Sequence, residues 1–326
     1  MVSSVPFDYT WPVKRARKQK SKHCHLCLVV NESAGKFDNK VVEKLVETIR
    51  KNGAQYTVLR PESAIDLADA AKAACGLRRP GRFLPPQFGK RGPVTGLVAC
   101  GGDGTFNLVA RASAKAELPV GILPMGRFNN ICRSLYGNDD ASVSIEKIIA
   151  RGYTKIDSGS VAGQDFYGSI AFGLVPQMIE LLKHRGRPRF GIGWARLALQ
   201  AARDIERRSM VIIVDAFRFE LSPAILNISL LSHAAGIQWV GPALNDDGSL
   251  EVVFDVDAET KDLASLIRQL SRKKYQYGTT VRMYRGQSVI VQPTKDRVLY
   301  LDGELLELPA NQVDVSVSPK SLMVFN

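Results

Sequence analysis

LVACGGDGTFNLV, residues 97–109, decides the fold of this chain, because an apolar run leads into a glycine-rich loop and then into a helical pattern. The stretch predicts a buried strand at Leu97–Cys100 and a helix that opens at Thr105. Three glycines lie in the loop: Gly101, Gly102 and Gly104. Because glycine lacks a Cβ, such a loop brings backbone N–H groups close to an anion, and the helix N-terminus adds its positive dipole end. The pattern therefore predicts a phosphate-binding loop.

Asp103 lies inside this loop. A bare phosphate would repel its carboxylate, so we expect Asp103 to face a bound cation or a hydroxyl group instead. Glycine turns between a strand and a helix are common. The full string GGDGT with both flanking elements is much more specific than two glycines alone.

On both sides of this loop, short β-branched runs alternate with helical patterns, which is typical of a parallel sheet with crossover helices. The predicted strands are Leu26–Val30, Tyr56–Leu59 and Val120–Leu123. One predicted helix presents a single apolar face, made by Val42, Leu45, Val46 and Ile49. Two more helices are predicted, at Ala64–Ala74 and near Phe128–Leu135.

After Asp157 the chain changes to closely spaced strands and turns, which predicts an antiparallel, sandwich-like second domain. The candidate strands are Phe166–Phe172, Met210–Val214, Ile225–Leu231, Leu250–Val256, Val281–Met283, Ser288–Val291 and Val298–Leu301. Two predicted helices interrupt them, Trp194–Arg207 and Asp262–Arg272. The expected fold class is α/β, with an N-terminal parallel-sheet nucleotide-binding domain, a C-terminal antiparallel β-sandwich-like domain and a cleft between them.

The predicted domain bounds follow these changes in pattern. Residues 1–23 are expected to form a basic, disordered tail, residues 24–157 the nucleotide-binding domain and residues 158–306 the β-rich domain. With 326 residues, of which 45% are apolar and 23% charged, the chain is expected to fold into more than one compact unit.

The composition also bears on location and partners. No apolar run reaches the roughly 18 residues that span a bilayer, and five irregularly spaced cysteines favour a reducing compartment, so we expect a cytoplasmic protein. The net charge of +12 suits anionic partners, which include nucleic acid, an anionic membrane surface and a phosphorylated substrate. Charge alone does not choose among them.

Four further segments, taken with GGDGT, resemble the catalytic domain shared by diacylglycerol, sphingosine and ceramide kinases and their bacterial lipid kinase relatives. Asn31–Gly35 resembles the family's N-P-x-S-G loop without its Pro, and Leu123–Leu135 resembles P-x-G-T-x-N-D-F-A-R-x-L. Gly241–Leu250 is similar to P-x-A-x-x-D-D-G-x-L, and Asp302–Glu304 is similar to the family's D-G-E. The five ordered matches cover nearly the whole chain.

This resemblance implies an ATP- and Mg²⁺-dependent kinase that passes the γ-phosphoryl group to a lipid hydroxyl, such as that of diacylglycerol. It also implies that residues 307–326 complete the nucleotide-binding domain and that residues 158–306 form the domain that takes the lipid substrate. It implies that Asp302 accepts the hydroxyl proton, with Glu304 beside it at the cleft and Asp103 near the Mg²⁺. Asp247 is implied as a ligand of a second, structural cation. The implied nucleotide contacts are Asn31, Gly35, Gly101, Gly102, Gly104, Thr105, Gly126, Arg127 and Asn129.

Plain turn residues are the competing interpretation of two of these positions. Asp302-Gly303 is also the commonest signal of a β-hairpin, and Asp247 suits an ordinary turn as well as a cation site.

Two residues depart from the family pattern, Arg127 at the family's Thr and Asn130 at an acidic position. Arg127 either clamps phosphate as a bidentate cation or fills the nucleotide pocket, which would leave a non-catalytic lipid- or nucleotide-binding protein. An NAD kinase is the other alternative, since that related family also carries GGDGT. The residues around Gly126 fit the lipid kinase pattern better.

The expected partners are a lipid substrate and an anionic membrane surface, on which the enzyme would be peripheral. A nucleic-acid partner is not expected, and the sequence leaves a homodimer open. Cationic and aromatic residues mingle in Lys183–Phe190 and Arg272–Tyr277, a mixture that suits either a lipid headgroup surface or a solvated face.

Overall fold

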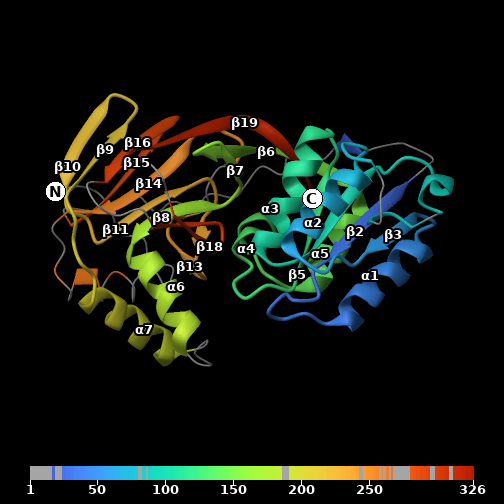
Figure 1. Ribbon diagram of the computed structural model, residues 1–326, viewed down its shortest axis with the longest axis horizontal. Coiled ribbons are helices and arrows are strands. Elements are labelled where there is room, and N and C mark those ends of the chain that lie inside the picture. The colour runs from blue at the N-terminus through green and yellow to red at the C-terminus, as the bar shows by residue number, and fades with distance from the viewer. Residues whose placement is uncertain are drawn as a thin grey trace, which may run out of the picture.

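The computed structural model describes residues 17–18, 24–79, 83–85, 87–185, 191–241, 245–256, 259, 262–263, 266, 280–293, 298–307 and 311–326. They form two lobes that lie side by side, one with α1 to α5 and the other with α6 and α7 (Figure 1). We name these the first lobe and the second lobe. None of the helices within the described residues combines the length and the apolar character that crossing a bilayer requires.

Four parallel strands build the sheet of the first lobe. Their order is β5 (Val120–Pro124), β4 (Gly96–Gly101), β2 (His25–Val30) and β3 (Gln55–Leu59). Every residue of β2 and β4 is buried, as expected for a parallel sheet that helices cover on both faces. All three strands predicted from the apolar runs around the glycine loop are therefore present, as is the strand of the loop itself.

The first two helices of the first lobe begin at side chains that cap them. Asp38 accepts a hydrogen bond from the Lys40 N–H at the start of α1 (Asn39–Lys51), and Ser63 accepts one from Asp66 at the start of α2 (Ala64–Ala74). Helix α1 buries Val42, Leu45 and Ile49, the face that its periodicity predicts. The other helices of this lobe are α3 (Asp103–Lys115), α4 (Asn130–Tyr136) and α5 (Ala141–Ala150).

The second lobe is built on two antiparallel sheets. The first has the order β10 (Phe217–Leu221), β9 (Met210–Val214), β16 (Ser288–Pro293) and β19 (Val313–Phe325). The second has the order β15 (Val281–Gly286), β14 (Leu250–Asp255), β11 (Ile225–Ser229), β8 (Ser169–Gly173), β17 (Val298–Leu301) and β18 (Glu304–Glu307). The predicted architecture, a parallel α/β unit joined to an antiparallel sandwich-like one, is confirmed.

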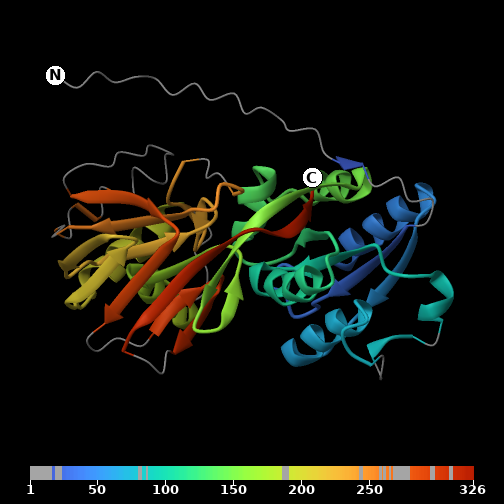
Figure 2. The same cartoon turned by 90° about the horizontal axis from the view of Figure 1, so that it is seen from above.

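Two long strands run through both lobes. Strand β6 (Gly152–Val161) pairs antiparallel with β19, from Tyr153 opposite Phe325 to Val161 opposite Val315, with a bulge between Ser318 and Leu322. Strand β19 also pairs with β5 in the first lobe and with β16 in the second. Figure 2 shows β6 and β19 crossing from one lobe to the other. The lobes are therefore parts of one continuous sheet.

Several elements differ from the prediction. Helix α3 begins at Asp103 rather than at Thr105, and the single strand expected at Phe166–Phe172 is two strands, β7 (Gln164–Phe166) and β8. Helices α5 and α6 (Leu174–Arg185) were not predicted, and α7 occupies Gly191–Arg203.

Four other predicted segments lie wholly or partly outside the described residues. Most of the helix expected at Asp262–Arg272 and most of the tail expected at residues 1–23 lie outside the described residues. Within that tail, Arg17–Lys18 form a short strand, β1, that pairs with Gly152 and Tyr153. The basic segments at residues 186–190 and 272–277 are also outside the described residues, while Lys183 and His184 on α6 pair with Glu180.

Candidate functional site

Three loops meet at the carboxyl ends of β2, β4 and β5, and hydrogen bonds hold them together. The Asn31 amide donates to the Thr105 hydroxyl at 2.9 Å, so the first loop is tied to the start of α3. The Lys36 N–H donates to the Met125 carbonyl, and the Met125 N–H donates to the Gly101 carbonyl, each at 2.8 Å. The segments that the sequence singled out far apart therefore form one surface.

The glycines of these loops allow backbones to touch. A Cβ added at Gly102 would lie 2.9 Å from the Gly126 Cα, and one at Gly126 would lie 2.3 Å from the Gly102 Cα. A Cβ at Gly101 would meet the Thr105 hydroxyl at 2.3 Å. In this arrangement glycine serves loop-to-loop packing. Gly35 lies at the exposed rim, where an added Cβ would be 3.9 Å from the Arg127 backbone nitrogen.

Arg127 and Asn129 lie in the same loop but have different surroundings. Asn129 is buried, accepts a hydrogen bond from the Gly126 N–H at 2.7 Å and donates to Asp139 at 3.2 Å. It therefore holds the loop in shape. Arg127 is exposed, and within the residues that the structure describes its side chain has no hydrogen-bond or ion-pair partner. Of these two predicted nucleotide contacts, Asn129 is buried, whereas the charged side chain of Arg127 is exposed and available to a ligand.

Asp103, the first residue of α3, caps the N-terminus of α4. One of its oxygens accepts a hydrogen bond from the Ile131 N–H at 2.9 Å, and the other accepts from the Asn130 N–H at 3.1 Å and from the Asn130 amide at 3.2 Å. The carboxylate is 6% exposed. Burial raises its pKa to about 6, with a further upward contribution from Asp302, although the donors from α4 oppose the rise.

This raised pKa gives a stability prediction for Asp103→Asn. The folded protein binds the Asp103 proton more tightly than the unfolded chain does, so the stability gained from this group is present at low pH and is lost as the pH rises through about 6. A rise of about 2 units in the pKa of Asp103 corresponds to about 3 kcal/mol in the free energy of unfolding, summed over the whole titration. Urea unfolding in chelator, without nucleotide, should show the wild type gaining more stability than the variant between pH 7 and pH 5. Equal gains would contradict the prediction.

Asp302 and Gly303 form the two-residue turn of a hairpin between β17 and β18, where Leu301 pairs with Glu304. Both turn residues have positive φ, 46° and 108°, so the hairpin interpretation of Asp-Gly is confirmed. The Asp302 side chain nevertheless points inward and is 3% exposed. It accepts hydrogen bonds from the Tyr167 N–H at 2.8 Å and the Ser169 N–H at 2.6 Å, and from the side chain of Asn107. Burial raises its pKa despite these donors.

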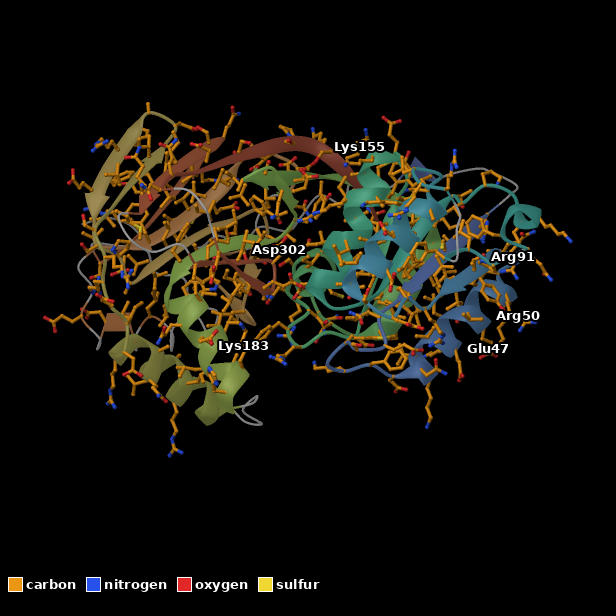
Figure 3. The ribbon with its side chains drawn as sticks, in the orientation of Figure 1. Glu47, Arg50, Arg91, Lys155, Lys183 and Asp302 are labelled. Atoms are coloured by element: carbon orange, nitrogen blue, oxygen red, sulfur yellow. The ribbon has the colours of Figure 1, made fainter. Side chains whose placement is uncertain are left out.

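The hairpin brings acidic groups of the second lobe against the glycine loop of the first. Figure 3 shows Asp302 where the second lobe faces the first. A Cβ at Gly303 would be 3.8 Å from the Asp103 Cβ, and one at Gly104 would be 3.2 Å from the Glu304 carboxylate. The three predicted catalytic residues, Asp103, Asp302 and Glu304, therefore lie at the start of α3.

Asn130 joins the lobes, a role that the sequence did not reveal. Its amide nitrogen donates to Asp103 and also to the Tyr300 hydroxyl at 3.2 Å, while its amide oxygen accepts from the Gly236 N–H at 2.8 Å. An aspartate here would set a second carboxylate against Asp103. The one indication of this role in the sequence is that Asn130 departs from the family pattern, and its partners in the structure explain that departure.

Gly168 is the other residue that sequence reasoning missed. A Cβ there would be 2.5 Å from an Asp302 oxygen, so only glycine lets the turn between β7 and β8 close over the carboxylate. The ring of Phe106 on α3 packs edge-on against Tyr167 of the same turn, with ring centroids 6.0 Å apart.

The predicted metal ligands do not fit a protein-held cation. Both oxygens of Asp103 accept hydrogen bonds from α4, and Asp247 forms an ion pair with Arg285 and accepts from the Ser249 N–H. The described residues contain no group of three His, Cys, Asp or Glu side chains placed to bind a metal. A cation at either aspartate would have to compete with these partners for the carboxylate oxygens.

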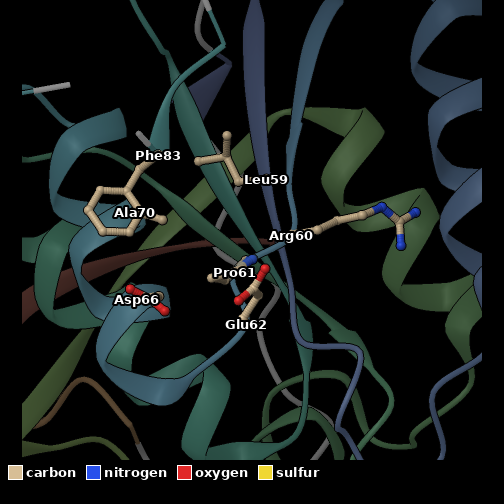
Figure 4. Close-up of a pocket in the computed structure, with 7 residues that line it drawn as sticks. All are labelled: Leu59, Arg60, Pro61, Glu62, Asp66, Ala70 and Phe83. Atoms are coloured by element: carbon tan, nitrogen blue, oxygen red, sulfur yellow. The ribbon is translucent and has the colours of Figure 1, made fainter. Parts of the chain in front are cut away.

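A small pocket of about 170 Å³ lies at the end of β3, beside the loops. Its walls combine the apolar groups of Leu59, Ala70 and Phe83 with the carboxylates of Glu62 and Asp66. Figure 4 shows the Arg60 side chain pointing away from Phe83, and Arg60 in fact contacts Glu32 and Asn39.

Family models match both parts of the chain. Residues 25–161 match the diacylglycerol kinase catalytic domain, and residues 168–326 match the YegS C-terminal NAD kinase beta sandwich-like domain. The chain therefore carries a diacylglycerol kinase catalytic domain. Between them the two models cover the cleft from the Asn31 loop to the Asp302 hairpin.

Curated relatives carry the diacylglycerol kinase name. One from Staphylococcus saprophyticus is 28% identical over 225 residues, which are 66% of this chain and 72% of the relative. One from Staphylococcus aureus is 26% identical over 225 residues, with 66% and 70% covered. A crystal structure of a diacylglycerol kinase from Bacillus anthracis has a TM-score of 0.70 at 15% identity and covers 94% of this chain and 98% of its own, so it shares the fold.

Proposed function

We propose that this protein is an ATP-dependent lipid kinase that phosphorylates a lipid hydroxyl, such as that of diacylglycerol. The observation that carries the proposal is the meeting of the two lobes, where the Asp302-Gly303 hairpin touches the start of α3 beside the glycine loop. Phosphoryl transfer needs a phosphate cradle and an acceptor site at one place, and this contact supports both.

The proposed donor is Mg·ATP, with its phosphates on the glycine loop. Mg²⁺ enters this proposal bound to phosphate oxygens, because both oxygens of Asp103 and of Asp302 already accept hydrogen bonds. Strand β3 is two strands from β4 in the sheet, so the pocket at its end is about 10 Å across the sheet edge from the glycine loop. We assign the nucleoside to this pocket, where Glu62 and Asp66 offer acceptors for an exocyclic amine and Phe83 offers a ring for stacking.

In the proposed reaction the lipid hydroxyl oxygen forms a bond to the γ-phosphorus. The bond from the γ-phosphorus to the bridging oxygen breaks, and its electron pair leaves with ADP. The proton of the hydroxyl passes to the Asp302 carboxylate, and burial raises the pKa of this group, which favours its taking up the proton. Glu304, exposed beside Gly104, is assigned to the same rim of the cleft.

A transfer assay tests this function. Radiolabelled ATP is offered with a panel of lipids in vesicles, and NAD is included as the alternative acceptor. Label in a lipid is the expected result, and label in NAD would replace the proposal with an NAD kinase. No transfer, together with a melting temperature that rises with Mg·ATP, would indicate a non-catalytic nucleotide-binding protein.

We also propose peripheral association with an anionic membrane surface, in keeping with the net charge of +12. The transfer assay, run on anionic and on neutral vesicles at low and at high salt, tests this association. Turnover should be higher on anionic vesicles and should fall with salt, since exposed charges are screened over about 10 Å at 0.1 M salt.

Arg127→Thr tests the phosphate site. Arg127 is exposed beside Gly35 with its guanidinium unpaired among the described residues, so we assign it to a phosphate of ATP. Loss of a charged hydrogen bond of about 1.5–3 kcal/mol should weaken ATP binding by roughly 10-fold or more. Calorimetry on the variant measures this. Arg50→Thr on α1, at the outer edge of the first lobe in Figure 3, is the bystander control. Tighter ATP binding by Arg127→Thr would mean that Arg127 obstructs the pocket.

A further inference from the structure

The turn before β14 gathers negative charge. Asp247 lies in this turn and Glu251 on the strand, where Glu251 is 3% exposed. One of its oxygens, Oε2, is buried without a hydrogen-bond partner among the described residues. Asp247 is exposed, but the buried Glu251 carboxylate needs a cation, because an uncompensated buried charge is costly.

Arg285 supplies that charge from the neighbouring strand. Strands β14 and β15 pair so that Arg285 is directly opposite Glu251. One guanidinium nitrogen, Nη2, forms an ion pair with the Asp247 carboxylate and lies 3.4 Å from Oε1 of Glu251. A single guanidinium therefore contacts both acidic groups from the position that a cation would take between them.

The turn matters to the rest of the fold because it is fastened to the strands that join the lobes. The Gly248 N–H donates to one oxygen of Asp157 on β6, and the Lys320 N–H at the bulge of β19 donates to the other, each at 2.7 Å. Asp157 is 2% exposed. Any interaction that orders the turn at residues 247–251 therefore also stabilises the place where β6 pairs with β19.

We infer that Arg285 is the built-in cation of this turn and that the turn binds no divalent metal. This assignment replaces the structural cation expected at Asp247 and does not depend on the proposed kinase activity. The guanidinium fills the space that a metal ion would need. Because Mg²⁺ and Ca²⁺ must lie within about 2.0–2.6 Å of their oxygen ligands, either ion could bind between these carboxylates only if Arg285 left.

Thermal unfolding without nucleotide tests the inference. The wild type should melt at the same temperature in chelator and in millimolar Mg²⁺ or Ca²⁺. Arg285→Gln should melt several degrees lower in chelator, because it leaves a buried carboxylate unpaired, and should recover part of the loss with either cation. The double variant with Asp247→Asn should lose that recovery. Arg282→Gln, three residues away on the same strand and exposed, should behave as the wild type does.

Two results would overturn the inference. One is a wild type stabilised by Mg²⁺ or Ca²⁺ in a way that Asp247→Asn abolishes, since the turn would then hold a metal beside Arg285. The other is an Arg285→Gln protein that matches Arg282→Gln in every condition. If Arg285→Gln does not fold, calorimetric titration of Mg²⁺ and Ca²⁺ into the wild type and into Asp247→Asn decides the matter, since Asp247-dependent heat would refute the inference and its absence would support it.

Discussion

Asp302→Asn should lower turnover on the best lipid substrate by about 10²- to 10⁴-fold while changing the affinity for ATP little, because the amide cannot accept a proton. Asp302 lies on the second lobe, and the glycine loop lies on the first, so the substitution leaves the proposed phosphate contacts in place. Single-turnover transfer measures the first effect, and calorimetric titration of Mg·ATP measures the second.

The substitution also has a structural cost that must be separated from the chemical one. Asp302 accepts backbone hydrogen bonds with both oxygens, from Tyr167 and from Ser169. An asparagine amide nitrogen would face one of those donors, so the melting temperature should fall as well. Normal ATP affinity at a temperature well below melting shows that the variant is folded. Wild-type turnover in such a protein would leave Asp302 as a hairpin anchor, and Asp103 would become the candidate base.

The local parts of this site could be predicted because each is written in adjacent residues. The string from Leu97 to Val109 indicates its strand, loop and helix through composition alone, and Asp302-Gly303 indicates a tight turn. The apolar face of α1 follows from residue spacing. These features need no knowledge of what lies across the cleft.

The missed features depend on partners far away in the chain. Asn130 meets Tyr300 across 170 positions, and Asp302 meets the Tyr167 backbone across 135. The sequence indicated that Asp103 should avoid a bare phosphate, but not that α4 would take up both of its oxygens. The Arg285 ion pair likewise depends on the register between two strands. Such pairings are set by the assembled sheets, which periodicity does not report.

The close packing of Gly102 and Gly126 explains why a bulky residue at Gly102 is a poor test of phosphate binding. Its side chain would strike the backbone of the neighbouring loop as well as any ligand, so loss of binding would have two causes. Gly126→Ala is a smaller change at the same contact. The added Cβ would lie 2.3 Å from the Gly102 Cα, which is backbone, and 2.8 Å from Oδ1 of the buried Asn129, which accepts a hydrogen bond from the Gly126 N–H. The two loops must therefore separate.

We expect Gly126→Ala to lower turnover by about 10²-fold, because a displacement near 1 Å of a phosphate cradle misaligns the transferred group. Transfer assays and ATP calorimetry measure this, and overpacking of about 1–3 kcal/mol should lower the melting temperature too.

Two matched controls isolate the cause. Gly121→Ala brings a Cβ to 2.7 Å from Ile148 on the α5 side of the sheet, so it should destabilise the protein without a comparable loss of turnover. Gly89→Ala meets nothing within 4 Å and should be neutral. If Gly121→Ala and Gly126→Ala lose turnover equally, then general destabilisation accounts for the loss. A Gly126→Ala protein with wild-type ATP affinity and turnover would remove the Gly126 loop from the phosphate site.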